Sequence, residues 1–257
     1  MEIRYNFKLN KQFNNIRRSF EIYKMNKKVI LVLAVILAVA LCEESLAKYQ
    51  FIPKVTQPRQ KAPFFSAIAV QPNGKFETVS LNQYAGKYLV IVFYPFDFTY
   101  VCPTELVAFS DAIDQFKAIN ADVIAISTDS HFTHLAWIKT PRTEGGVGNL
   151  KIPLLADISK KISKAYGVLV EDELDELYGA ALRGLFIIDG KGTIRTVQIN
   201  DAPVGRSVEE TLRLIKAFQH TDTHGEVCPA NWQPGQKTII PDQDQKIKYF
   251  SNEKKDL

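Results

Sequence analysis

Residues 87–94, KYLVIVFY, most restrict the fold, because they are apolar on both faces of an extended chain. A strand of this kind is covered on both sides, as at the centre of an α/β sheet. Residues 122–128, DVIAIST, predict a second such strand. Residues 184–189 and 193–199 flank the turn GKG at 190–192 and predict a hairpin.

Helical patterns lie between these strands. After Pro103, apolar side chains recur at helical spacing and line one face: Leu106, Phe109, Ile113 and Phe116. A later helix is predicted to begin at a capping box, SVEE at 207–210. Its inward side chains are Val208, Leu212, Ile215 and Phe218. Alternating strands and helices predict one α/β domain with a mixed central sheet.

The positive charge of the chain is confined to its N-terminal segment. Residues 1–47 carry eight basic and four acidic side chains, which account for the net charge of +4, so residues 48–257 are formally neutral. Composition therefore gives no reason to expect nucleic-acid binding. Residues 29–41 are an unbroken apolar run that is too short to cross a hydrocarbon core of about 30 Å. With Lys27-Lys28 before it, the run is typical of a secretory signal peptide.

Small side chains indicate two cleavage sites, after Cys42 and after Ala47, and we favour the second. Either one removes Cys42 and leaves two cysteines. An uncleaved signal anchor is the weaker alternative, because the run is short. Met25 begins a signal by itself, so residues 1–24 are interpreted as an upstream extension of the reading frame. We expect the protein in the endoplasmic reticulum lumen or outside the cell, with no membrane contact after cleavage.

The chain is predicted to have four parts. They are a signal region (1–47), an N-terminal extended segment (48–63), a core domain (64–219) and a polar C-terminal arm (220–257) that carries Cys228.

Cys102 is the residue most suited to chemistry, because it ends a strand and precedes Pro103, which favours the first turn of a helix. A helix N-terminus favours a thiolate and can lower a thiol pKa from about 8.5 to roughly 3.5–7.5. Position alone leaves an inert buried thiol equally open. Glu105 stands where a Cys-x-x-Cys motif needs its second cysteine, and no papain-like signature is present. The remaining possibility is that Cys102 reacts alone and that a second thiol, distant in the sequence, then forms a disulfide with it. Cys228, which also stands in a Val-Cys-Pro sequence, is the candidate for this second thiol.

Residues 93–110, FYPFDFTYVCPTELVAFS, strongly resemble the active-site stretch of typical 2-Cys peroxiredoxins. The resemblance runs from about residue 62 to residue 250 and includes further stretches at 130–137, 152–157, 183–189, 203–207 and 224–229. With its signal peptide, the chain resembles the secretory-pathway branch of that family. The resemblance implies a thioredoxin-like α/β fold, with a mixed central sheet flanked by helices and a C-terminal arm.

The resemblance also implies a peroxide site made of Pro95, Thr99, Cys102 and Arg183. Cys102 would attack a peroxide oxygen and become a sulfenic acid. The fixed fork of the Arg183 guanidinium would stabilise the thiolate and the polarised peroxide. The Thr99 hydroxyl would orient the peroxide, and Pro95 would shield the pocket from water. Hydrogen peroxide and small organic hydroperoxides are the implied substrates.

The rest of the cycle follows from the same resemblance. Glu105 and Arg206 would hold Arg183 in place. Cys228, from the second subunit of a head-to-tail homodimer, would condense with the sulfenic acid to form a Cys102–Cys228 disulfide. Thioredoxin or a protein disulfide isomerase-like protein would reduce that disulfide. No metal, haem, flavin or other cofactor is implied.

Three stretches bear on regulation and assembly. Residues 145–148, GGVG, and the Tyr249-Phe250 pair resemble family motifs that pack over the active-site helix, slow its unwinding and favour overoxidation. The acidic stretch VEDELDELYGAA is longer than the family usually has, with extra residues near 174–178. Because that region lies near the family's dimer–dimer contact, the decamer remains an open expectation.

Other interpretations stay open. The protein could instead be an oligomeric holdase chaperone, or a disulfide donor in oxidative protein folding. His220, His224 and Cys228 have helical metal-ligand spacing, but a fourth ligand is missing, so zinc is disfavoured. His131 and His134 are interpreted as capping and packing a helix rather than as an acid–base pair.

Overall fold

The computed structural model describes residues 17, 18, 27, 29–32, 34–39 and 56–253. The chain divides into two units, Met1–Pro53 and Lys54–Leu257. In the first unit, residues 29–32 and 34–39 are helical and exposed. Both predicted cleavage sites and Cys42 lie outside the described residues. No helix in the described ranges combines the length and apolar character needed to span a bilayer.

A seven-stranded mixed sheet forms the centre of the second unit, in the order β2-β1-β5-β4-β3-β6-β7. The strands are β1 (Ser66–Val70), β2 (Phe76–Ser80), β3 (Tyr88–Phe93), β4 (Ala121–Ser127), β5 (Leu154–Ala156), β6 (Arg183–Ile188) and β7 (Ile194–Asn200). Strands β3, β4 and β5 run parallel, and the remaining neighbours pair antiparallel. The predicted α/β fold with a mixed sheet is confirmed, as is the β6–β7 hairpin.

Strand β3 is covered on both faces, as its composition predicts. All six of its residues are buried. Val90 and Val92 pack into an apolar cluster that contains Cys102. Leu89, Ile91 and Phe93 belong to a second cluster. Because successive side chains of a strand point to opposite faces, the alternation places one core on each side of the sheet.

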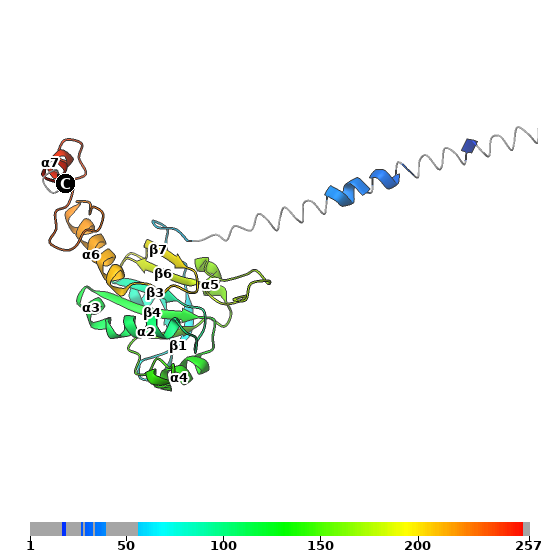
Figure 1. Ribbon diagram of the computed structural model, residues 1–257, viewed down its shortest axis with the longest axis horizontal. Helices are drawn as coiled ribbons and strands as arrows, with labels where there is room; N and C mark the ends of the chain where they lie inside the picture. Colours follow the sequence, from blue (N-terminus) through cyan, green and yellow to red (C-terminus); the bar gives the residue numbers. More distant parts are fainter. Residues whose placement is uncertain (1–16, 19–26, 28, 33, 40–55, 254–257) are drawn as a thin grey trace, which may run out of the picture. The chain divides into compact units, whose positions relative to one another are not determined.

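Helices cover both faces of the sheet. The helices of this unit are η1 (Leu81–Tyr84), α2 (Cys102–Asp111), α3 (Ile113–Ala118), α4 (His131–Lys139), η2 (Arg142–Glu144), α5 (Lys161–Tyr166), α6 (Val208–His224) and α7 (Lys246–Glu253). Side chains of α2, α3, α4 and α6 belong to the cluster that contains Cys102, and those of α5 belong to the other cluster. Figure 1 shows α6 leading away from the sheet towards α7 and the C-terminus.

Two predicted helices differ from expectation in detail. The apolar stripe after Pro103 is buried as predicted, but it spans two helices, because Ala112 (φ −87°, ψ 2°) interrupts the α-helix between α2 and α3. At the start of α6, the Ser207 side chain accepts from the Glu210 backbone N–H, as an N-cap does. The reciprocal half of the capping box is absent, because the Glu210 carboxylate pairs with Arg213 instead.

At both ends of the predicted core domain, 64–219, the neighbouring segment is part of the folded structure. Helix α6 continues to His224 and ends at Gly225, whose φ of 70° suits glycine, so the boundary at residue 219 falls inside this helix. The lead-in segment is tied to the β6–β7 turn, because the Ala62 N–H donates to the Gly192 carbonyl and the Ile194 N–H to the Gln60 carbonyl.

The acidic stretch at residues 170–181 forms a loop that closes on itself. The Gly179 N–H donates to the Val170 carbonyl, and the Val170 N–H donates to the Ala180 carbonyl, both at 2.9 Å. Beyond this base the chain makes tight turns, and the Leu174 side chain is 95% exposed. The residues near Leu174 therefore extend outward, and the strand that begins with Arg183 is paired along its length with β7.

Replacing Ile91 by alanine tests the importance of the central strand. The side chain is fully buried, so the variant should lose about 2–5 kcal/mol of unfolding free energy in urea titrations. Leu174→Ala is the matched control, because it removes an exposed aliphatic side chain and should change stability by less than about 0.5 kcal/mol. Equal losses in both variants would contradict this assignment of the core.

Candidate active site

Cys102 is the first residue of α2 and is fully buried. Its place at a helix N-terminus agrees with the sequence-based expectation, but the expectation that it ends a strand is wrong, because β3 ends at Phe93 and residues 94–101 form a loop before α2. Pro103 follows as the second helical residue rather than the first, at a position where its missing N–H breaks no helical hydrogen bond. The helix dipole at this end favours the thiolate form of the sulfur.

Arg183 approaches this sulfur from strand β6. Its Nη1 lies 3.3 Å from the Cys102 Sγ and 2.7 Å from Glu105 Oε2, and the residue is only 3% exposed. Its Nε donates to the carbonyl oxygen of Ala202. A guanidinium held in this way presents a fixed positive charge to the thiol and to any oxygen bound beside it. The predicted proximity of Cys102 and Arg183 is present in the structure.

Glu105 connects Arg183 to Arg206 in a buried network. The Glu105 carboxylate accepts from Arg183 Nη1 and from the Arg206 backbone N–H, Nε and Nη2, at 2.7–2.9 Å. Arg206 Nη1 also donates to the carbonyls of Phe93 and Gly184. Burial alone would raise the pKa of Glu105, but the hydrogen bonds and charge of Arg206, with the charge of Arg183, hold it below its usual value. The carboxylate stays ionised and fixes both guanidiniums.

The loop between β3 and α2 carries the other two predicted site residues. Pro95 is buried and Thr99 is half-buried. The Thr99 hydroxyl donates to the Phe96 carbonyl at 3.0 Å, so its oxygen lone pairs remain free to accept from a ligand. Phe98, between them, has a φ of 55°, a left-handed conformation that a bulky residue rarely adopts.

A buried histidine lies beneath this loop. His134 is fully buried, and its Nδ1 lies 2.8 Å from Asp97 Oδ2. His131 instead packs against the rings of Phe76 and Phe132, so the two histidines have different surroundings. Ser130 rather than a histidine caps helix α4. Sequence reasoning missed the partnership with Asp97, because 37 residues separate the two side chains.

Cys228 lies apart from Cys102. Its sulfur is 3.6 Å from the Ala217 carbonyl and 3.8 Å from Thr221 Oγ1, both on α6, and both thiols are free. The arm that carries Cys228 is anchored rather than loose, because Trp232 is 2% exposed and its carbonyl accepts from Arg213 Nη1. Within one chain the structure does not bring the two cysteines together.

The histidines near Cys228 pair with other groups. The rings of His220 and His224 stack with centroids 4.1 Å apart, and His220 Nε2 lies 3.8 Å from Glu226 Oε2. Over the ranges that the structure describes, no three His, Cys, Asp or Glu side chains are arranged to hold a metal ion.

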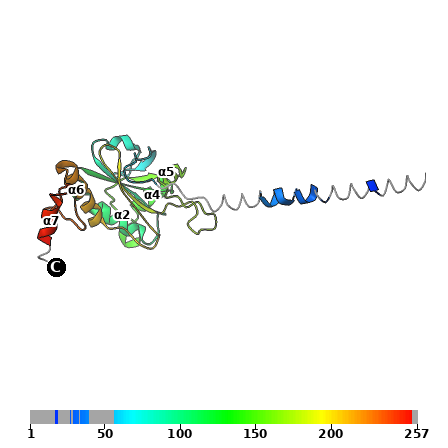
Figure 2. The same cartoon turned by 90° about the horizontal axis from the view of Figure 1, so that it is seen from above.

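The aromatic pair of α7 does not cover α2 within one chain. Figures 1 and 2 both place α7 beyond the end of α6 rather than on α2. Tyr249 and Phe250 contact each other edge to face, and Phe250 is 54% exposed. The expected covering of the active-site helix by this pair is not made within one chain and stays a prediction for the dimer.

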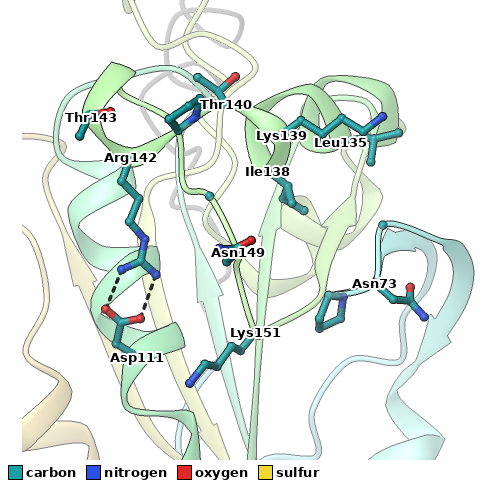
Figure 3. Close-up of a pocket in the computed structure, with 14 residues that line it drawn as sticks. Asn73, Asp111, Leu135, Ile138, Lys139, Thr140, Arg142, Thr143, Asn149 and Lys151 are labelled. Atoms are coloured by element: carbon teal, nitrogen blue, oxygen red, sulfur yellow. Dashed lines mark hydrogen bonds and ion pairs between the residues drawn. The ribbon is translucent and has the colours of Figure 1, made fainter.

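A hollow of about 850 Å³ lies at the other end of α2, between that helix, α4 and the turn after β1. Figure 3 shows Arg142 and Asp111 joined at one side of it by two hydrogen bonds, which are 2.8 and 2.9 Å long. Arg142 Nε also donates to the Val147 carbonyl, so the pair ties the GGVG stretch to α2. None of the predicted site residues lines this hollow.

Comparison with known proteins places these features in a family. The family model described as "AhpC/TSA family" matches residues 58–197, and that for the "C-terminal domain of 1-Cys peroxiredoxin" matches residues 217–252. Peroxiredoxin-4 of Bos taurus is 59% identical over 197 residues, which cover 77% of this chain and 69% of the relative. Peroxiredoxin-1 of Gallus gallus is 58% identical, covering 75% of this chain and 94% of the relative.

Solved structures agree with the sequence relatives. The reduced 2-Cys peroxiredoxin of Plasmodium vivax superposes with a TM-score of 0.73 at 44% identity, covering 76% of this chain and 99% of that chain. The mitochondrial 2-Cys peroxiredoxin of Plasmodium falciparum has a TM-score of 0.62 at 43% identity, covering 67% of this chain and all of that one.

Glu105→Gln tests the buried charge network through its pH dependence. Because the pKa of Glu105 is lowered on folding, its stabilisation is present above the unfolded value of about 4.3 and is lost as pH falls through the folded value. The variant should lose about 2 kcal/mol at pH 7, and less in acid, in urea unfolding. Glu176→Gln, on the exposed loop, should show neither effect. A deficit that does not vary with pH would contradict the assignment.

Proposed function

This chain belongs to the AhpC/TSA family, as a thiol-dependent peroxidase of the 2-Cys peroxiredoxin type, and we propose that Cys102 is the residue that peroxide oxidises. The observation that carries the proposal is the 3.3 Å approach of Arg183 Nη1 to a buried sulfur at a helix N-terminus. Together the guanidinium and the helix stabilise the thiolate, which is the nucleophilic form.

The first step is the attack of the Cys102 thiolate on one peroxide oxygen. The S–O bond forms as the O–O bond breaks, sulfur is oxidised to sulfenic acid, and the second oxygen leaves with a proton as water or an alcohol. Arg183 stabilises the negative charge that develops on the peroxide oxygens as the O–O bond breaks. The free lone pairs of the Thr99 hydroxyl support its role as an acceptor that orients the hydroperoxide. Buried Pro95 limits the access of water to the site.

The second step condenses the sulfenic acid with the Cys228 thiol, which forms a disulfide and releases water. We propose that the thiol comes from a second subunit in a head-to-tail homodimer. The Cys228 sulfur packs against α6, away from the Cys102 of its own chain, which supports this assignment. Thioredoxin or a protein disulfide isomerase-like dithiol then reduces the disulfide and is itself oxidised.

Assembly beyond the dimer and location in the cell also belong to the proposal. The closed base of the acidic loop keeps its extra residues from disturbing β6, so we propose that dimers form despite the insertion, with a decamer dependent on how the loop packs. The apolar run after Lys27-Lys28 supports entry into the secretory pathway, and sequencing the N-terminus of protein recovered from cells would distinguish the two cleavage sites.

Cysteine variants test the two steps separately. Cys102→Ser should abolish peroxide consumption and all disulfide formation. Cys228→Ser should still consume about one equivalent of peroxide but form no dimer-linking disulfide on non-reducing gels. With excess peroxide and reductant, mass spectrometry should find a gain of about 32 Da on the Cys102 peptide, more in Cys228→Ser than in the native chain. Peroxide consumption by Cys102→Ser would refute the assignment.

Arg183→Lys tests the role of the guanidinium. Lysine keeps the charge but loses the fork that reaches the sulfur and Glu105, so the rate constant with hydrogen peroxide should fall roughly 10²-fold in stopped-flow measurements. Arg195→Lys is the matched control, because Arg195 pairs with Asp222 rather than with a site residue, and it should react at nearly the native rate. A native rate in Arg183→Lys would contradict the role.

A further inference from the structure

A buried pair, Asp97 and His134, holds the loop that leads from β3 to Cys102. Asp97 is 7% exposed and His134 is fully buried. His134 Nδ1 lies 2.8 Å from Asp97 Oδ2, and its Nε2 lies 3.2 Å from the Leu155 carbonyl oxygen. Because burial removes competing water, contacts of this kind are stronger than on the surface, and costly to break.

The hydrogen-bond partners of His134 require one proton between its Nδ1 and the Asp97 carboxylate. The Leu155 carbonyl can only accept, so His134 Nε2 carries a hydrogen. His134 Nδ1 then faces a carboxylate oxygen, and a hydrogen bond between them needs one proton on either the imidazole or the carboxyl. Burial raises the pKa of Asp97, although the hydrogen bond and charge of His134 oppose that change. His134 Nδ1 and Asp97 Oδ2 are therefore each other's nearest hydrogen-bond partners.

Two further contacts fix Asp97. The Tyr94 hydroxyl donates to Asp97 Oδ1 at 2.8 Å, and burial and Asp97 raise the pKa of Tyr94 well above its usual value, so the phenol remains a donor. The Asp97 backbone N–H donates to Asp129 Oδ2 at 3.0 Å, and that carboxylate also accepts from Ser127. The groups around Asp97 thus come from the end of β3, the end of β4 and helix α4.

The residue after Asp97 is strained. Phe98 has a φ of 55°, and a bulky side chain keeps such a strained conformation only where the surrounding structure enforces it. Its ring lies 6.0 Å from that of Trp137 and is 51% exposed, so packing alone does not hold it. Asp97 is the neighbouring residue that is fixed on several sides, and Thr99 follows the bend directly.

We propose that Asp97, held by His134, is a positioning residue for peroxide: it maintains the bend at Phe98 and thereby aims the hydroxyl of Thr99 at the substrate. The inference rests on the proposed roles of Cys102 and Thr99. The groups that lie directly at the sulfur are different ones, Arg183 and the N-terminus of α2. Loss of Asp97 should therefore impair reaction with peroxide much more than reaction with a reagent that needs only a thiolate.

Asp97→Ala and Asp97→Asn in the full chain test this separation. Two rates are measured on the Cys102 peptide by mass spectrometry: oxidation by hydrogen peroxide and alkylation by iodoacetamide. In Asp97→Ala, oxidation should slow at least roughly tenfold while alkylation changes less than about twofold. Asp97→Asn should recover most of the oxidation rate, because its amide can donate to His134 Nδ1 and accept from Tyr94.

Three results would overturn the inference: oxidation of Asp97→Ala at the native rate, equal slowing of oxidation and alkylation, or no recovery in Asp97→Asn. If Asp97→Ala does not fold, His134→Ala and His134→Asn provide the same comparison, since the asparagine amide can replace Nδ1 as the partner of Asp97. A native chain whose Cys102 resists peroxide would instead contradict the proposed function itself, so the two failures are distinguishable.

Discussion

The buried carboxylate of Glu105 is the interaction on which the rest of this site depends. It accepts from two arginines that come from different parts of the chain, and one of them also binds carbonyls at the ends of β3 and β6. A buried charge is costly unless it is fully paired, so this arrangement tolerates little displacement. The start of α2, and with it the Cys102 sulfur, is thus fixed relative to the end of β6 from which Arg183 extends.

Local patterns predict much of the fold. The doubly apolar run of β3, the β6–β7 hairpin and the N-cap at Ser207 all follow from short stretches of sequence, and each is present. The interruption at Ala112 has no comparable signal, because the apolar spacing continues across it. The domain boundary at residue 219 follows composition and falls inside α6, which ends at Gly225, a residue typical of helix ends.

The site is less accessible to reasoning from residues alone. The place of Cys102 before Pro103 indicates a reactive thiol, but nothing local distinguishes Arg183 and Arg206 among 32 basic residues, and the family resemblance supplied both. Asp97 and His134 lie far apart in sequence, and their pairing exists only once α4 packs beside the end of β3. Burial creates their mutual dependence, and single-sequence patterns do not report which polar residues are buried together.

The closed base of the acidic loop has a consequence for how this fold can change. Two backbone hydrogen bonds between Val170 and residues 179–180 separate the loop's length from the geometry of the sheet. Since lengthening a surface loop adds only about 0.6 kcal/mol for each doubling, residues can accumulate there at small cost. The outer turns near Leu174 are thus a natural graft point, where an epitope or a reporter peptide can be carried while the thiol chemistry stays intact.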